Sequence, residues 1–137
     1  MADTVRRIEY FTVEIADEPG EAFRVFSALK DAGVNLLGAV GFPTTAGKGQ
    51  LSLLPADSDS LAKATRLPGL TVRAKKQAFF VQGADRVGAV AEVLRKLGEA
   101  KINVTAFNAT AAREGGYGMV LWVKPEDVAK ASKALGV

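Results

Sequence analysis

Two short segments of this sequence carry the residue types that would bind a small charged molecule. Asp17-Glu18-Pro19-Gly20 and Asp85-Arg86-Val87-Gly88 each place a carboxylate and a glycine just before an amphipathic stretch. A helix that begins after such a turn offers backbone N–H groups and a positive dipole end to a carboxylate. The Asp17 and Asp85 side chains can accept hydrogen bonds from an ammonium group. Together these groups suit a zwitterion.

Each amphipathic stretch ends in a second segment with an asparagine, Gly33-Val34-Asn35-Leu36 in one case and Lys101-Ile102-Asn103-Val104 in the other. An Asn side chain can both donate and accept hydrogen bonds. The same residues also have purely structural explanations, because Asp commonly caps a helix start and Gly and Asn commonly end a helix. Both interpretations stay open from the sequence alone.

The two pairs of segments belong to an internal repeat. A shift of 68 positions superimposes matching residues along most of the chain, pairing Phe11 with Phe79, Val13 with Val81, Asp17 with Asp85, Leu29 with Leu97 and Asn35 with Asn103. One module is therefore written twice. Copies of about 68 residues are near the lower size limit for an independent core, so we expect them to pack on each other.

The amino-acid composition argues against several classes of function. The 137 residues are 48% hydrophobic and 24% charged, typical of a globular protein. The absence of Cys and His removes disulfides, thiolate or imidazole metal ligands and the usual triad base. The acidic residues fall on expected turns and polar helix faces, so we expect no catalysis, no cofactor and no metal. No run approaches the ~20 apolar residues of a membrane span and the start has no apolar signal, so a cytoplasmic location is expected.

Hydrophobic periodicity predicts the same order of elements in both copies. The first copy has strands at Thr4–Ala16, Val34–Phe42, Gly49–Leu54 and Leu70–Ala74, with one helix between Gly20 and Gly33 and another at Ser60–Leu67. The second copy has strands at Gln77–Gly83, Ile102–Ala112 and Tyr117–Val123, a helix at Gly88–Ala100 and a last helix opened by Pro125. We expect the helices to face the sheets through Ala22, Val25, Phe26 and Leu29, through Val90, Val93, Leu94 and Leu97, and through Val128, Ala131 and Leu135.

This order predicts an α+β protein of two tandem ferredoxin-like βαββαβ modules, residues 1–75 and 76–137, with antiparallel sheets and helices on one face. The second module lacks a fourth strand, because the chain stops at Val137. Thr4-Val5-Arg6 resembles Thr71-Val72-Arg73, so the N-terminal segment is a candidate for the missing strand. The alternative is that residues 4–7 only lengthen the first strand.

Strand, Asp-x-Pro-Gly, amphipathic helix and a Gly-(Val/Ile)-Asn-(Leu/Ile) return to a strand resemble the signature of the ACT domain, a small-ligand module of regulated amino-acid enzymes. The resemblance covers nearly the whole chain as two copies. The second copy departs from the signature at Val87, which replaces Pro, and at Lys101, which replaces Gly.

The resemblance implies a non-catalytic regulatory or sensor protein that binds a free amino acid between one module's first strand–helix loop and a neighbour's second strand. It also implies a homodimer and a regulated partner protein. The residues that it places at the ligand are Asp17, Glu18, Gly20, Asn35 and Leu36 in the first copy and Asp85, Arg86, Val87, Gly88, Asn103 and Val104 in the second.

Two other functions compete with this one. RNA-recognition-motif domains share the element order and stack bases on strand aromatics. Gly116–Trp122 looks like their third-strand motif, Phe79 sits where the first-strand aromatic would be, and residues 69–137 carry eleven Lys and Arg against six acidic residues. Tyr117 and Trp122 lie five residues apart on opposite strand faces, however, so one of them is expected in the core. The other alternative is a structural or interaction module without a ligand.

Overall fold

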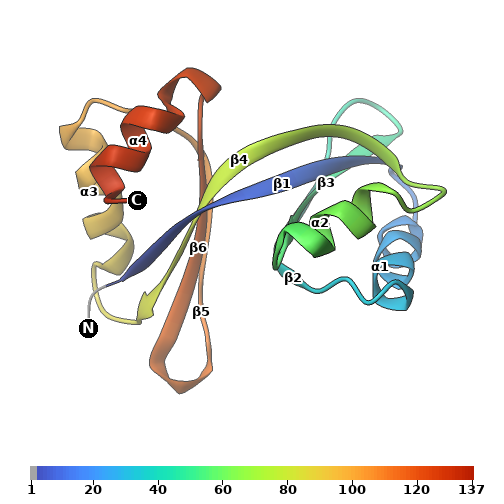
Figure 1. Ribbon diagram of the computed structural model, residues 1–137, viewed down its shortest axis with the longest axis horizontal. Helices are drawn as coiled ribbons and strands as arrows, with labels where there is room; N and C mark the ends of the chain where they lie inside the picture. Colours follow the sequence, from blue (N-terminus) through green and yellow to red (C-terminus); the bar gives the residue numbers. More distant parts are fainter. Residues whose placement is uncertain (1–2) are drawn as a thin grey trace. The chain divides into compact units, whose positions relative to one another are not determined.

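The computed structural model describes residues 3–137, which form an α+β fold of six strands and four α-helices (Figure 1). The elements in chain order are β1 (Thr4–Ala16), α1 (Glu21–Asp31), β2 (Leu36–Pro43), β3 (Lys48–Pro55), α2 (Ser58–Thr65), β4 (Thr71–Ala84), α3 (Ala89–Glu99), β5 (Val104–Ala111), β6 (Gly116–Val123) and α4 (Val128–Leu135). Short 3₁₀ turns at Arg113–Gly115 and Pro125–Asp127 precede β6 and α4.

Internal contacts divide the chain into two compact units. Glu9–Lys76 forms one, here called the N-terminal module. Met1–Ile8 together with Gln77–Val137 forms the other, here called the C-terminal module. Both β1 and β4 therefore contribute residues to both modules. β1 begins in the C-terminal module and continues into the N-terminal module.

In the N-terminal module the strand order is β2-β3-β1-β4. β1 and β3 are antiparallel with Phe11 opposite Leu53, and β2 and β3 are antiparallel with Ala39 opposite Leu53. The inward faces of these strands and of α1 and α2 share one buried core, made of Phe11, Val13, Val25, Leu29, Val34, Leu51, Leu53, Leu61 and Ala64. Element order and strand order match the split ferredoxin-like unit.

The C-terminal module has the order β1-β4-β6-β5, with β4 and β6 antiparallel through Val81 and Met119 and β5 and β6 antiparallel through Phe107 and Leu121. Helices α3 and α4 lie side by side against its strands (Figure 1). Its buried core is Phe79, Val81, Ala89, Val93, Leu97, Ile102, Tyr117, Met119, Leu121, Val123, Ala131 and Leu135.

The N-terminal segment packs on the C-terminal module. Val5 contacts its core, and the hydroxyl of Tyr117 donates a 2.8 Å hydrogen bond to Asp3. The segment therefore supplies the strand that residues 77–137 lack. The same residues also lengthen the first strand, because β1 runs unbroken from Thr4 to Ala16, so the structure combines the two alternatives.

One predicted break in the chain does not exist. The strands predicted at Leu70–Ala74 and Gln77–Gly83 are parts of a single strand, β4, of 14 residues. The sequence between them, Lys75-Lys76, contains no Gly or Pro that would force a turn, so the backbone stays extended.

The predicted helix stripes are partly buried. In α1, Val25 and Leu29 are buried, but Ala22 is exposed and Phe26 is 38% exposed. In α3, Val93 and Leu97 are buried, whereas Val90 and Leu94 are only partly buried. As in α1, the two buried residues are four positions apart. In α4, Ala131 and Leu135 are buried and Val128 is partly buried. Each helix therefore buries a narrower stripe than the sequence predicts.

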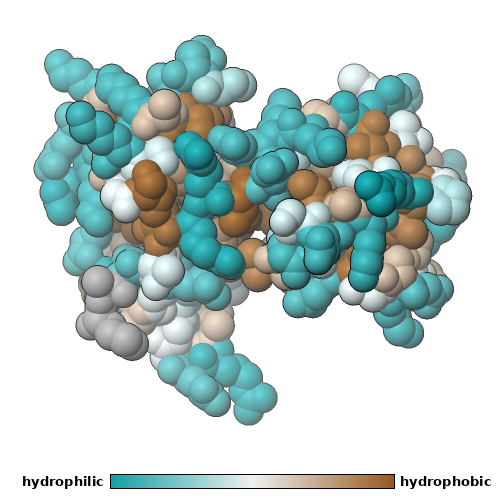
Figure 2. All heavy atoms as spheres, viewed as in Figure 1, coloured by the Kyte–Doolittle hydropathy of each residue, from teal (hydrophilic) through white to brown (hydrophobic). Residues whose placement is uncertain are grey.

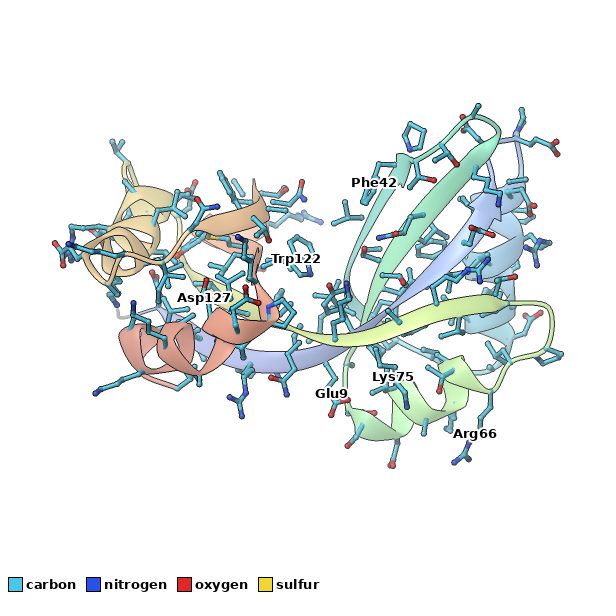
Figure 3. The ribbon with its side chains drawn as sticks, turned by 90° about the horizontal axis from the view of Figure 1, so that it is seen from above. Glu9, Phe42, Arg66, Lys75, Trp122 and Asp127 are labelled. Atoms are coloured by element: carbon cyan, nitrogen blue, oxygen red, sulfur yellow. The ribbon has the colours of Figure 1, made fainter. Side chains whose placement is uncertain are left out.

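Most of the face drawn in Figure 2 is hydrophilic, with hydrophobic side chains showing between the charged ones. Four phenylalanines are substantially exposed among the described residues, namely Phe23, Phe26, Phe42 and Phe107. Phe42 projects from β2 (Figure 3).

Both repeats end their first helix in the same way, although only one uses glycine. The amides of Gly33 and Val34 donate to the carbonyls of Lys30 and Leu29, and Gly33 has φ +72°. In the second copy Lys101 takes this position with φ +59°. A left-handed conformation costs a residue with a Cβ about 1 kcal/mol, which glycine avoids. The second copy therefore carries a local strain that the first lacks.

We expect Lys101→Gly to raise the free energy of unfolding by about 1 kcal/mol and Gly33→Lys to lower it by a similar amount. A Cβ at Gly33 would meet nothing within 4 Å, so the cost there is one of backbone conformation alone. Urea unfolding of the two variants measures the difference. Equal and negligible changes in both would contradict this account.

Val5→Ala should lower the free energy of unfolding by about 1 kcal/mol, because it removes methyl groups that pack on the core of the C-terminal module. Thr4→Ala is the matched control, since Thr4 is exposed on the same strand and its replacement should change stability by less than about 0.5 kcal/mol. Indistinguishable denaturation midpoints for the two variants would mean that the segment is not anchored through Val5.

Candidate functional site

The predicted helix starts are built alike in both modules. Gly20 and Gly88 precede α1 and α3 with φ +88° and +84°, a conformation that favours glycine, and neither helix has a side-chain cap. Nothing lies within 4 Å of where their Cβ atoms would be, so backbone conformation rather than crowding requires glycine. The first turns of both helices are therefore left without a capping oxygen from a side chain.

The preceding aspartates are fixed by their backbones rather than by their side chains. The amide of Asp17 donates to the carbonyl of Gly47 at 3.1 Å, and the amide of Asp85 donates to the carbonyl of Gly115 at 2.7 Å. These bonds tie each loop to the hairpin tip of its own module. Both side chains are exposed, as expected for groups that could accept an ammonium.

In the N-terminal module the structure separates the predicted residues. Asn35 and Leu36 line a pocket of about 440 Å³, together with Phe26 and Lys30, at the C-terminal end of α1. Asp17, Glu18 and Gly20 lie before the other end of this 11-residue helix, about 16 Å away at 1.5 Å per residue, and do not line the pocket. The two halves of the predicted site do not meet within this module.

In the C-terminal module a pocket of about 250 Å³ lies at the start of α3. Three predicted residues line it, Asp85, Arg86 and Gly88. The rest of the lining comes from the first turn of α3 and from β5 and β6, as Ala89, Val90, Ala91, Ala109, Thr110, Ala111 and Tyr117. The strand at this pocket is the module's own second strand, whereas the ACT resemblance implies a neighbour's.

The other predicted residues of this copy do not line the pocket. Val87 points into solvent and is fully exposed. Asn103 is exposed and Val104 partly buried, and both follow the far end of α3. The arrangement repeats that of the first copy, with the asparagine and the helix start at opposite ends of one helix.

Arg86 is the most connected polar side chain at this pocket. Its Nη1 donates to the carbonyl of Ala84 at 2.9 Å and to Oδ1 of Asp3 at 3.2 Å. Its Nη2 forms an ion pair with Glu92 at 2.5 Å and lies 3.4 Å from Oδ2 of Asp3. The first copy has Glu18 at the equivalent position, so only the second copy has an arginine in the loop before its helix.

Burial and charge shift the acidities of this cluster. Burial, together with the hydrogen bond to Asp3 and the negative charge of its carboxylate, raises the pKa of Tyr117 to about 12, although Arg86 acts in the opposite direction. Burial alone would raise the pKa of Asp3, but the hydrogen bonds from Arg86 and Tyr117 outweigh it and lower the pKa. The hydrogen bonds to Asp3 and Glu92 raise the pKa of Arg86, so its positive charge is secure.

Sequence reasoning missed Asp3 as a member of this cluster, and placed Tyr117 in a different function. Nothing near Asp3 in the sequence signals its contact, because the partners are 83 and 114 residues away. Gly83 is the one local signal. A Cβ there would overlap the carboxylate of Asp3, so β4 leaves room for it.

Two of the three aromatics proposed for base stacking are buried. Tyr117 and Phe79 are 6% and 1% exposed and belong to the helix-covered core. Trp122, on the opposite face of β6, is partly buried (Figure 3). The expectation that one of the pair Tyr117 and Trp122 lies in the core is confirmed, and nothing supports the RNA-binding alternative.

Across residues 3–137 no helix is both long and apolar enough to cross a membrane. Within the same residues no group of three or more acidic side chains, His or Cys is arranged to hold a metal ion.

Known structures share this architecture. Protein BT0572 from Bacteroides thetaiotaomicron is similar with a TM-score of 0.78 at 18% identity, over 96% of this chain and 88% of its own. The ligand-free regulatory subunit of aspartate kinase from Thermus thermophilus has a TM-score of 0.64 at 14% identity, over 99% and 95% of the two chains. Aspartokinase III from E. coli, in complex with aspartate and ADP, has 0.54 at 16%, over 98% of this chain and 32% of its own.

At these identities the likeness establishes a shared fold. No family model and no curated protein matches the sequence. The fold expected from the repeat is thus also the fold of two regulatory subunits of aspartate kinase.

Asp3→Asn should lower the pKa of Tyr117 from about 12 towards its ordinary value of 10, because it removes the negative charge beside the phenol. Titration of tyrosinate absorbance in a Tyr10→Phe background isolates Tyr117, since the chain has two tyrosines.

The raised pKa of Tyr117 contributes stability below pH 10 that is lost as pH rises towards 12. The pKa of Asp3 is lowered in the folded protein, so Asp3 contributes stability above pH 3.8, and this stability is lost as the pH falls.

The unsubstituted Asp3 protein supplies the comparison, in the same Tyr10→Phe background. An identical tyrosine titration with and without the Asp3 carboxylate would show that the two side chains do not interact in solution.

Proposed function

We propose that this chain is a non-catalytic regulatory protein of two ACT-like modules, and that it binds a small amino acid at the start of α3. The observation that carries the proposal is the 250 Å³ pocket in which Asp85, Arg86 and the uncapped helix start converge. A helix N-terminus and a guanidinium stabilise a carboxylate, and an exposed aspartate accepts from an ammonium. These are the two charged ends of an amino acid.

The shared fold supports the same proposal. The aspartate kinase regulatory subunits resemble this chain over nearly its whole length, and one structural neighbour is a complex with aspartate. ACT membership would also account for the duplicated Asp-x-x-Gly loops. Binding can regulate a partner only if the ligand has different affinities for two states of the protein.

Assembly into a homodimer is part of the proposal. The terminal strands of the sheet order are β2 and β5, and neither contains a charged residue. Uncharged edges of eight residues offer unpaired backbone groups to another strand, and proteins usually protect such edges with charge or cover them. A second copy of this chain is the simplest cover.

The predicted site of the first copy remains a second candidate. Asn35 and Leu36 line a larger pocket, beside the exposed Lys30, which could attract a carboxylate. The loop of Asp17, Glu18 and Gly20 would join a ligand there only across different modules or different chains. We therefore propose that the two copies bind with different affinities.

Thermal-shift screening against the twenty amino acids at millimolar concentration tests the proposal. A ligand at a hundredfold excess over its Kd stabilises the protein by about 2.7 kcal/mol, which is readily detected as a rise in Tm. Asp85→Ala should abolish the rise without lowering the basal Tm, because its side chain is exposed.

Asp17→Ala is the matched control, being the equivalent exposed residue of the copy whose loop lines neither pocket. If it removed the rise as completely as Asp85→Ala, the site would not be the one at α3. If no amino acid raised the Tm of the unsubstituted protein, the proposed function would be wrong.

A further inference from the structure

Two residues that line the α3 pocket already hold a carboxylate from the chain itself. Nη1 and Nη2 of Arg86 lie 3.2 and 3.4 Å from Oδ1 and Oδ2 of Asp3. The hydroxyl of Tyr117 donates to Oδ2 at 2.8 Å. Two N–H groups of one guanidinium facing both oxygens of one carboxylate is the paired geometry with which arginine binds carboxylate ligands.

From this arrangement we propose that Asp3 occupies the carboxylate-binding position of the α3 pocket, and that a small carboxylate ligand binds there by displacing it. The proposal rests on the function proposed above, because it concerns the same pocket, and it adds what regulates access to that pocket. Asp3 is then an internal competitor rather than a structural ion pair alone.

Arg86 would stay in place if Asp3 moved away. Arg86 is also held by the carbonyl of Ala84 at 2.9 Å and by Glu92, so its guanidinium keeps two partners. Its side chain is 33% exposed, whereas the Asp3 side chain is 12% exposed. The donors are therefore held in place and partly exposed, and the carboxylate that covers them comes from the residue just before β1.

The same local structure shows how Asp3 comes to fit. Gly83 on β4 faces the Asp3 carboxylate, and any side chain at Gly83 would overlap it and would also press on the ring of Tyr117 at 3.0 Å. A larger residue at position 83 should therefore expel Asp3 while leaving Arg86 in place.

The walls of the pocket indicate the size of the ligand. The side chains beside Arg86 and Tyr117 are small, with four alanines from α3 and β5, namely Ala89, Ala91, Ala109 and Ala111. A volume of about 250 Å³ holds a small molecule only. The chemical class is a carboxylate with a short apolar or ammonium-bearing tail.

Displacement of Asp3 would couple ligand binding to the N-terminal strand. Residues 4–8 join the C-terminal module as its added strand, and Asp3 is the first described residue of that segment. A ligand that removes Asp3 loosens the segment, and by reciprocity a loosened segment tightens ligand binding. An internal competitor lowers apparent affinity by the fraction of time it occupies the position.

Acetate tests the proposal, with acetamide as its uncharged counterpart. Titrations followed by the backbone amide NMR signals of Gly88 and Ala89 would compare the unsubstituted protein, Asp3→Ala and the exposed-site control Thr4→Ala. We expect acetate to bind Asp3→Ala at least about tenfold more tightly than the other two proteins, and acetamide to show no such difference. Adding Arg86→Ala to Asp3→Ala should abolish acetate binding.

Gly83→Ala is a second route to the same state, should Asp3→Ala fail to fold. It should also strengthen acetate binding, and saturating acetate should accelerate amide hydrogen exchange at residues 4–8 of the unsubstituted protein. Equal acetate affinity with and without Asp3, or no binding to any variant, would overturn the displacement model.

The two proposals fail separately. If an amino acid stabilises the unsubstituted protein but Asp3→Ala leaves acetate affinity unchanged, the proposed function stands and displacement is wrong. If no amino acid stabilises the protein but acetate still binds Asp3→Ala more tightly through Arg86, displacement stands and the amino-acid function is wrong.

Discussion

The contact of the Asp3 carboxylate with Arg86 and Tyr117 connects the beginning of the chain to a module that begins more than 70 residues later. Residues 77–137 supply three strands and two helices, and without a further strand β4 would end this module as an unpaired edge. The N-terminal segment completes the module, and Val5 adds an apolar contact to the polar one. The fold of the C-terminal module therefore depends on both ends of the sequence.

Duplication preserved the scaffold and let the two helix starts diverge. Both copies keep a left-handed glycine before the helix and a loop bonded to the hairpin tip. Glu18 in one copy corresponds to Arg86 in the other, and this one position reverses the charge beside the helix start. Because a positive helix end and a guanidinium favour an anion together, the electrostatics of the second copy suit a carboxylate better. The helix ends have diverged as well, since Lys101 adopts a left-handed conformation for which the first copy uses Gly33.

Burial decided between interpretations that the sequence left open. Tyr117 and Phe79 could be assigned to an exposed stacking surface or to a core, because an alternating strand has two faces and sequence does not say which one the helices cover. The structure places both residues under α3 and α4. Tyr117 nevertheless keeps its hydroxyl at the edge of the core, where it reaches Asp3. A residue proposed for one function thereby became part of a different site.

The sequence by itself determined the repeat, the order of strands and helices, and the loops at the helix starts, because these follow from local periodicity and from glycines that the backbone requires. It also predicted Asp85, Arg86 and Gly88 as ligand-binding residues, and the structure brings these three together at one pocket. Only the tertiary structure decided that β4 runs unbroken and that Asp3 meets Arg86. Such pairings depend on which strands become neighbours, and contacts between residues 83 or 114 positions apart leave no local pattern by which to find them.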